Sequence, residues 1–235
     1  MPLEYFEDLM ANEELRFNRA DKFKQDEQEG IPPDQYLRRV LNTKRYDPAE
    51  ELNLVHHIGS LAQDRESFFV NCWHLHRHET LEMWRGFGRD GVAICSRYSL
   101  LRKALDGLLD RTFLGLVRYG EEHLHSYNIL EFIYSKRLEF VNEREVRALI
   151  WCPGLTSGGA THIDSNNVPH TRPRPEYPPK TWMREFKWRR IDLKALLIGV
   201  VVSPFAGDSA IETARHWGNV RKLECEPRQS SLKIG

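Results

Sequence analysis

The spacing of apolar positions in the first part of the chain predicts two helices, a short strand and a loop. Residues 3–10 carry apolar side chains at helical spacing, and residues 14–18 alternate as a brief strand does. The polar stretch 24–33 ends in Gly-Ile-Pro-Pro, which indicates a loop. Asp47 followed by Pro48 and two glutamates is typical of a helix start, because these residues cap the first turn and suit its positive end.

The middle of the chain alternates short apolar runs with amphipathic stretches. The runs are rich in β-branched and aromatic residues and are bounded by turn residues, which is typical of strands. The expected strands span residues 67–73, 91–95, 114–119 and 145–151. The amphipathic stretches predict helices over residues 78–87 and 129–138, and another helix that Ser99 caps.

Regular patterning stops over residues 153–179, where the chain has Gly-Gly, Asn-Asn and six prolines. Loops of this length are usually functional, so we expect a long irregular loop or lid. The pattern resumes beyond it and predicts two strands, a capped turn, a helix ended by a glycine and a last strand. These elements are the strands 183–191, 198–202 and 220–225, the turn at Asp192, and the helix 208–217 followed by Gly218.

Helices and short strands are therefore mixed, without the strict strand–helix–strand rhythm of a doubly wound sheet. This order favours an α+β fold with a mixed, mostly antiparallel sheet and packed helices. A chain of 235 residues can bury a substantial core as one unit, so we expect a single domain over residues 1–235.

The charges are balanced, with 34 Lys and Arg against 34 Asp and Glu. Such a chain lacks the general attraction to phosphates that drives nucleic-acid binding, although a local groove can still provide it. The first residues lack the basic and apolar regions of a signal peptide, and the longest apolar run, residues 196–202, is too short to span a membrane. We therefore expect a cytoplasmic chain without a membrane segment, whose four widely spaced cysteines are free thiols.

The most distinctive motifs of the sequence lie around the end of the expected strand 67–73. They comprise Cys72-Trp73-His74, Glu79, Met83-Trp84-Arg85-Gly86-Phe87-Gly88 and Gly91-Val92-Ala93-Ile94. Further ordered motifs are Leu15-Arg16-Phe17, Asp21-Lys22-Phe23, Lys136-Arg137, Asn142-Glu143-Arg144-Glu145-Val146-Arg147 and Val201-Val202-Ser203-Pro204. On these motifs the chain resembles, over most of its length, a bacterial family catalogued as domain of unknown function 2971.

The layout of that family is similar, at the level of the fold, to bacterial ADP-ribosyltransferases of the toxin type. The resemblance implies a split mixed sheet with a catalytic glutamate at the start of a late strand. It further implies an enzyme that consumes NAD, with a role as a toxin or a defence effector.

The run Glu143-x-Glu145-x-Arg147 has the chemistry that such a reaction needs. If the strand 145–151 extends back to residue 143, its period of two places all three side chains on one face, beside Lys136. Positive charge develops on the ribose when its bond to nicotinamide breaks, and a carboxylate that holds a ribose hydroxyl stabilises that charge. The alternative is an ion-pair network that completes a strand and has no catalytic role.

The enzyme hypothesis assigns a role to each further candidate residue. The catalytic carboxylates are Glu143 and Glu145, with NAD as the expected substrate. Candidates for contacts with the phosphates of NAD are Arg19, Lys136 and Arg147, since an arginine fork binds phosphate oxygens well. Candidates for stacking on nicotinamide or adenine are Trp73, Trp84 and Tyr119.

A metal site is not expected. The alternating residues Cys72, His74, His76 and His78 are acceptable zinc ligands by type. However, consecutive residues on one face of a strand lie roughly 6.5 to 7 Å apart, so only adjacent members could share an ion. We interpret them as solvated loop residues.

The alternative function is a non-catalytic module that binds a nucleotide, a nucleic acid or a protein. Aromatic and basic residues interleave after the long loop, from Lys180 to Arg190. Such a strip can stack bases while its charges follow a phosphate backbone, or it can be an amphipathic strand whose aromatic rings fill the core. A nucleic acid would contact Lys180, Arg184, Arg189 and Arg190.

Overall fold

The computed structural model describes residues 1–23, 29–33, 36, 64–106, 111–120, 124, 128–152, 160–163, 169–172 and 185–234. The contacts within the chain group its residues into two units. Unit 1 comprises Met1–Arg16, His74–Thr112 and Trp188–Gly235, and unit 2 comprises Phe17–Trp73 and Phe113–Lys187. Each unit therefore combines segments that are far apart in the sequence.

Unit 1 is built on a three-stranded sheet with the order β12 (Arg228–Gln229), β11 (Gly199–Val202) and β3 (Val92–Cys95). The central strand β11 runs antiparallel to β3 and parallel to β12. Its three valines are all buried, as expected for a central strand that is an unbroken apolar run.

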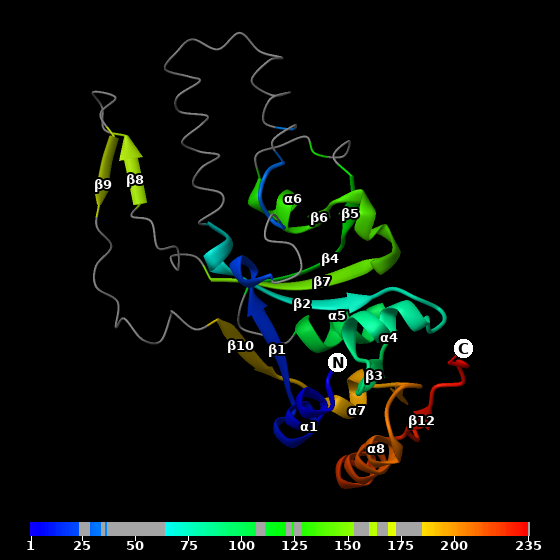
Figure 1. Ribbon diagram of the computed structural model, residues 1–235. Helices are drawn as coiled ribbons and strands as arrows, with labels where there is room; N and C mark the ends of the chain where they lie inside the picture. Colours follow the sequence, from blue (N-terminus) through cyan, green and yellow to red (C-terminus); the bar gives the residue numbers. More distant parts are fainter. Residues whose placement is uncertain are drawn as a thin grey trace. The chain divides into compact units, whose positions relative to one another are not determined.

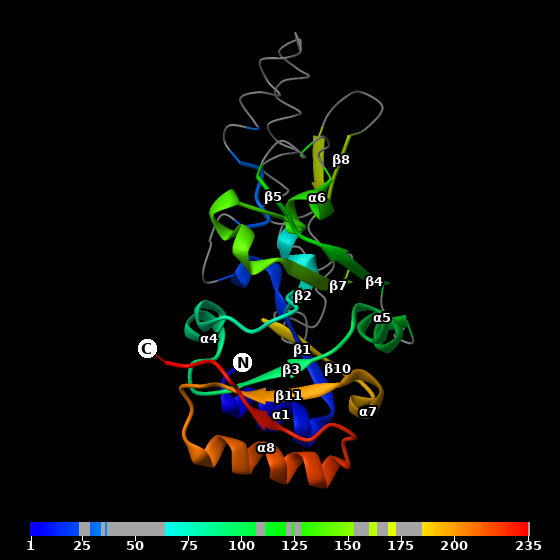
Figure 2. The same cartoon turned by 90° about the vertical axis from the view of Figure 1, so that its right-hand side faces the viewer.

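Helices cover this sheet and supply the rest of the core of unit 1. They are α1 (Leu3–Asn12), α4 (Leu81–Phe87), α5 (Tyr98–Asp106), α7 (Leu193–Leu196) and α8 (Asp208–Arg221). α8 packs against β11 and α1, and Figure 2 shows it lying along the strands of the sheet. Its buried positions are Ala210, Ala214 and Gly218, and these small residues let the helix approach its neighbours closely.

Unit 2 holds most of a five-stranded sheet (Figure 1). The strand order is β10 (Phe186–Arg190), β1 (Glu14–Arg19), β2 (Phe68–His74), β7 (Glu145–Trp151) and β4 (Arg111–Leu116). β1 runs antiparallel to β2, with Asn18 opposite Val70. β7 has neighbours on both edges, and its first six residues are all buried.

Shorter elements complete unit 2. They are the strand pairs β5 (Arg118–Tyr119) with β6 (Ser135–Lys136) and β8 (Ala160–Ile163) with β9 (Pro169–Arg172), the helix α6 (Ile129–Ile133), and the 3-10 helices η1 (Ala20–Lys22), η2 (Arg65–Ser67) and η3 (Leu138–Glu143). One core cluster joins Ala20, Phe68, Val70, Ile133 and Leu149. The ring of Phe68 stacks on that of Trp151 at 6.1 Å between centroids. The core therefore depends on contacts among β2, β7 and the end of α6.

The fold is α+β, with a mostly antiparallel sheet and packed helices, as the sequence predicts. The single domain over residues 1–235 stays a prediction, since the contacts define two units. None of the helices in the described ranges is both long enough and apolar enough to cross a membrane. The helix expected at Asp47 and most of the loop or lid expected over residues 153–179 lie outside the described residues.

Two predicted elements in unit 2 differ from the structure. The strand expected over residues 114–119 breaks at Val117, whose N–H bonds to the carbonyl of Glu145, so that β4 and β5 belong to different sheets. The helix expected over residues 129–138 ends at Ile133, because the chain then forms β6 beside β5. Tertiary pairing overrides the helical pattern here.

In unit 1 the structure differs from the prediction at the ends of two helices and at the last strand. α8 continues through Gly218 to Arg221, and Lys222 with φ 50° provides the left-handed cap in place of the glycine. The strand expected over residues 220–225 is therefore wrong, and the last strand is β12. Ser99 lies within α5 rather than before it. A Cβ at Gly218 would make ordinary van der Waals contact with Pro227 at 3.4 Å.

Replacing Gly115 in β4 by alanine should destabilise unit 2. A Cβ at this position would lie 2.8 Å from Cε1 of Tyr134, which packs on the core cluster, so the ring must move. We expect the free energy of unfolding to fall by about 1–3 kcal/mol, as for other overpacked sites. Chemical denaturation followed by far-ultraviolet circular dichroism measures this change.

The matched control is Gly86→Ala in α4, where a Cβ meets nothing within 4 Å. Alanine suits a helix better than glycine, so this variant should be more stable by about 0.5–1 kcal/mol. Equal stability of Gly115→Ala and the parent would contradict the packing described for Tyr134.

Candidate active site

A cluster of charged side chains lies inside unit 2 at the start of β7. We name its members, Glu29, Lys136, Glu143, Glu145 and Arg147, the carboxylate cluster. Lys136 Nζ donates to Glu143 Oε2 at 2.5 Å and to Glu145 Oε1 at 2.9 Å. Arg147 donates from Nε to Glu145 Oε2 at 2.7 Å and from Nη2 to Glu29. Each oxygen of Glu145 is therefore bound by a different cation.

The local structure explains how these side chains meet. Glu145 and Arg147 are two residues apart on β7, so they share a face of the strand, and Lys136 ends the short strand β6. Arg144, between η3 and β7, has φ 45°. This turn separates Glu143 from the strand, so β7 begins at Glu145, as the sequence predicts, and does not extend back to residue 143. Glu143 still reaches the cluster through its contact with Lys136.

Backbone and aromatic groups hold the two cations as well. Arg147 Nη1 donates to the carbonyl of Ile133 at 2.5 Å, and its guanidinium lies 5.2 Å from the ring centroid of Phe23. The ammonium of Lys136 lies 4.7 Å from the ring centroid of Phe140. Aromatic faces attract cations, so these rings contribute to the compensation of the buried charges.

Burial differs among the members of the cluster in a way that matters for chemistry. The side chains of Arg147 and Lys136 are 0% and 3% exposed, and those of Glu29 and Glu145 are 3% and 5% exposed. Glu143 is the most accessible member, with 15% of its side chain exposed. Any group that approaches the cluster from solvent therefore meets Glu143 first.

Among the described residues, three carboxylates of the cluster contact two cations. Burial raises the pKa of Glu145, and its hydrogen bond with Glu143 raises it further, to about 7, despite the opposing effect of Lys136. Burial lowers the pKa of Lys136, but the carboxylates of Glu145 and Glu143 outweigh this effect and raise it overall.

Tyr119 and Cys72 border the cluster. The phenol oxygen of Tyr119 accepts the backbone N–H of Glu145 at 2.8 Å, and burial raises the pKa of that phenol to about 12. Cys72 on β2 retains exposed surface, yet the protein atoms around it desolvate its thiol and the Glu145 carboxylate lies near it. Both effects raise the pKa of the thiol well above its ordinary value, so Cys72 stays protonated at neutral pH.

The structure joins four of the sequence-predicted site residues directly, namely Glu143, Glu145, Lys136 and Arg147, and places Tyr119 beside them. The other candidates have different neighbours. Arg19 forms an ion pair with Asp21 at 2.5 Å, and Trp73 donates from its indole to Asn71. Trp84 belongs to unit 1, where it is buried and donates to Glu79 at 3.2 Å. Their stacking or phosphate contacts stay predictions.

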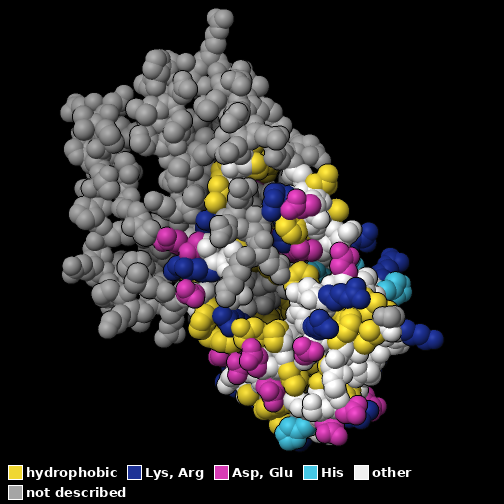
Figure 3. Space-filling view, in the orientation of Figure 1, with side chains coloured by type: hydrophobic (Ala, Val, Ile, Leu, Met, Phe, Trp, Pro, Cys, Tyr) yellow, Lys and Arg dark blue, Asp and Glu magenta, His cyan; other side chains and the backbone are white. Residues whose placement is uncertain are grey.

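The basic strip is only partly described, because Lys180 and Arg184 lie outside the described residues. Arg189 donates to the carbonyl of Trp188, and Arg190, whose side chain is 80% exposed, lies 3.6 Å from a carboxylate oxygen of Glu13. Figure 3 shows positive and negative side chains interspersed over the described part of the visible face. Binding of a nucleic acid through this strip stays a prediction.

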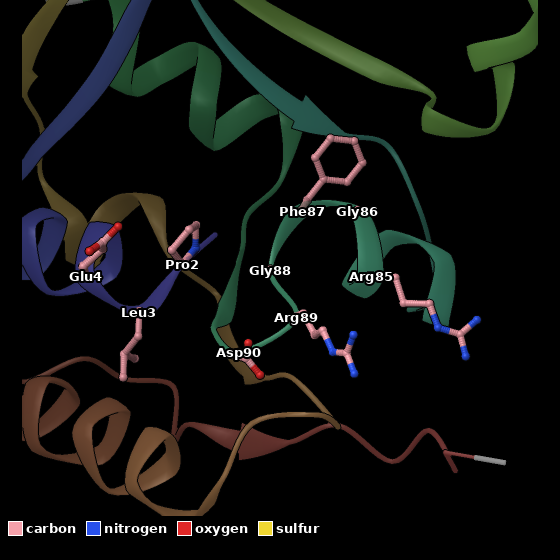
Figure 4. Close-up of a pocket in the computed structure, with 9 residues that line it drawn as sticks. All are labelled: Pro2, Leu3, Glu4, Arg85, Gly86, Phe87, Gly88, Arg89 and Asp90. Carbon is pink, nitrogen blue, oxygen red and sulfur yellow. The ribbon is translucent and has the colours of Figure 1, made fainter. Parts of the chain in front are cut away.

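An open pocket of about 490 Å³ lies in unit 1, between the start of α1 and the turn after α4. Residues 2–4 and 85–90 line it. The charged groups in its wall do not converge on one point: Figure 4 shows Glu4 on one side and Arg85 and Arg89 on the other. Ligand sites usually combine an apolar wall with a few convergent polar groups, so this pocket carries no functional assignment.

The histidines near β2 do not form a metal centre in the described ranges, where no three His, Cys, Asp or Glu residues are arranged to hold an ion. The ring centroids of His74 and His76 are 6.2 Å apart. His76 Nε2 is buried and has no hydrogen-bond partner among the described residues.

Comparison of the chain with models of protein families, with curated proteins and with solved structures found no match. The interpretation of the carboxylate cluster therefore depends on its geometry and on the resemblance noted from its motifs.

Glu29 is the member of the cluster that the sequence did not indicate. It lies within the polar stretch 24–33, which is expected to be a loop, and its partner Arg147 is 118 positions away. Gly30 next to it has φ 76°, a conformation that favours glycine. The one local signal is thus a glutamate before a glycine, which by itself does not predict a buried carboxylate.

The raised pKa of Glu145 predicts a pH dependence of stability. Between pH 4.5, its ordinary pKa, and about pH 7, the folded state keeps a proton that the unfolded state has released. The free energy of unfolding should therefore fall as the pH rises through this window, by up to about 1.4 kcal/mol per pH unit from this group. In Glu145→Gln this contribution disappears, so the variant should show a flatter profile from pH 5 to 7 in urea denaturation.

Glu139→Gln is a suitable control, because the side chain of Glu139 is 60% exposed and pairs with Arg137 at the surface, 3.1 Å away. In this variant the free energy of unfolding should depend on pH with the same slope as in the parent. Parallel profiles for the parent and Glu145→Gln would show that Glu145 ionises normally in the folded chain.

Proposed function

We propose that the chain is an NAD-consuming enzyme, an ADP-ribosyltransferase or NAD glycohydrolase, whose catalytic carboxylates are Glu143 and Glu145. The observation that carries the proposal is the pair of carboxylates that Lys136 bridges at the start of β7, with burial and Glu143 raising the pKa of Glu145 to about 7. General acids and bases act best when their pKa lies near the working pH. The resemblance to toxin-type ADP-ribosyltransferases supports the choice of NAD, and a role as toxin or defence effector belongs to the same proposal.

Each carboxylate has a distinct role in this reaction. Glu143, the more exposed of the two, accepts a hydrogen bond from a ribose hydroxyl and stabilises the positive charge that develops as nicotinamide leaves. Glu145 accepts the proton of the attacking nucleophile. When water is the nucleophile, its oxygen bonds to C1 of the ribose, the C–N bond to nicotinamide breaks, and the proton passes to Glu145.

In this proposal Lys136 and Arg147 bind and orient the carboxylates and do not contact the substrate. Arg147 is fully buried and donates to Glu145, Glu29 and Ile133, so we assign it to the orientation of Glu145 and not to a phosphate contact. Lys136 bridges Glu143 and Glu145 and keeps the two carboxylates close despite their repulsion. Tyr119 fixes the backbone of Glu145.

A test incubates the purified chain with NAD and measures free nicotinamide, in the presence and absence of cell lysate as a source of acceptors. Glu143→Gln and Glu145→Gln should each lower the rate by at least about 100-fold, the usual contribution of acid–base groups. The rate of the parent should depend on pH with a transition near 7, set by Glu145.

The control is again Glu139→Gln, which makes the same substitution in the same 3-10 helix at an exposed position. It should release nicotinamide at the parental rate. Circular dichroism and the unfolding midpoint establish that the active-site variants are folded. Nicotinamide release that survives both glutamine substitutions in folded protein would overturn the assignment of the catalytic residues, and no release by the parent would overturn the reaction.

A further inference from the structure

A lysine and a cysteine of unit 2 lie in unusually close contact. The ammonium nitrogen of Lys187, on β10, is 2.6 Å from the sulfur of Cys152, which directly follows β7. Hydrogen bonds to sulfur are longer than those to oxygen because sulfur is larger, so this separation is short for an N–H···S bond. It approaches the distance between nitrogen and sulfur atoms that are joined through a single oxygen.

The backbone on both sides of this contact is anchored. The N–H of Cys152 donates to the carbonyl of Ser67 at 2.8 Å, just before β2. β10 is held beside β1, where the carbonyl of Glu185 accepts the N–H of Arg19 at 2.7 Å. The two side chains therefore meet because hydrogen bonds of the sheet fix the backbone from which each of them extends.

The surroundings of Lys187 leave its amine available to sulfur. Its ammonium lies 5.3 Å from the ring centroid of Phe69 on β2, and in the described ranges no carboxylate lies within ion-pair distance of it. Both residues are partly buried, so the pair is shielded from bulk solvent but not sealed from a small oxidant. Among the described residues, Lys187 contacts the thiol and no carboxylate, which places its nitrogen for reaction with the sulfur.

We propose that Cys152 and Lys187 form an oxygen-bridged covalent cross-link, S–O–N, when the chain is exposed to hydrogen peroxide. This modification site is independent of the carboxylate cluster and of the proposed reaction with NAD. Like other oxidised forms of cysteine below the sulfinic level, the bridge is reversed by thiols.

The chemistry of the cross-link balances with two molecules of peroxide. The first converts the thiol of Cys152 to a sulfenic acid and leaves one water. The second supplies the oxidation of the Lys187 nitrogen, and the sulfur–oxygen group then bonds to that nitrogen with loss of two further waters. The ammonium of Lys187 first releases one proton to solvent. One S–H bond and one N–H bond of the resulting amine are then broken, one S–O and one O–N bond remain, and three waters carry the other oxygen atoms.

The bridge would join two positions 35 residues apart, one just after β7 and one near the start of β10. A cross-link restricts the unfolded chain, so oxidation should also raise the unfolding midpoint. Thiol treatment should return the midpoint to that of the reduced protein.

The test treats the intact chain with hydrogen peroxide and follows its mass before and after dithiothreitol. The cross-link adds one oxygen and removes two hydrogens, whereas a sulfenic acid adds one oxygen alone. Peptide mapping after trypsin should yield one linked pair of peptides that contains Cys152 and Lys187, with cleavage after Lys187 blocked. The other cysteines, Cys72, Cys95 and Cys225, serve as internal controls and should not link to a lysine.

Lys187→Arg keeps the positive charge but lacks the amine, and Cys152→Ser lacks the thiol. Neither variant should form the linked peptide, while both should keep the release of nicotinamide if the parent shows it. Peroxide-treated parent protein in which Cys152 carries only sulfenic or sulfinic acid would overturn the proposal. A linked pair of peptides without the added oxygen, in which sulfur bonds directly to nitrogen, would overturn it too. Both results are measured on the parent protein, so neither depends on whether a variant folds.

Discussion

The guanidinium of Arg147 is completely buried inside unit 2, and much of that unit depends on how its charge is compensated. Moving a charged group out of water costs several kcal/mol unless partners replace the lost solvation. Arg147 obtains them from Glu145 on its own strand, from Glu29, and from the carbonyl of Ile133 at the end of α6. Segments far apart in the sequence are therefore held at one point by one side chain.

The same compensation creates the chemistry of the cluster. Lys136 joins the carboxylate of Glu143 to that of Glu145. Burial and the hydrogen bond with Glu143 raise the pKa of Glu145 to about 7. The partly exposed Glu143 thus links a structural ion-pair network to a group that can exchange protons at neutral pH.

The two sites proposed in unit 2 lie at opposite ends of one strand. Glu145 begins β7 and has acid–base character, while Cys152 follows its last residue and contacts Lys187. Between them, β7 is buried and apolar apart from Arg147. A rigid central strand with neighbours on both edges keeps each group in place, which is what catalytic and cross-linking geometry both require.

The sequence by itself determined the α+β class, most of the strands and four members of the candidate site, because periodicity and charge spacing are local properties. Glu145 and Arg147 could be placed on one face from their spacing alone, and Lys136 was near enough in the chain to be expected beside them. Only the tertiary structure decided that Glu29 joins them and that Cys152 meets Lys187. It also decided that α6 ends at Ile133, where β6 pairs with β5. These outcomes depend on contacts between distant segments, whose free energy outweighs local preference and leaves no periodic signal in the sequence.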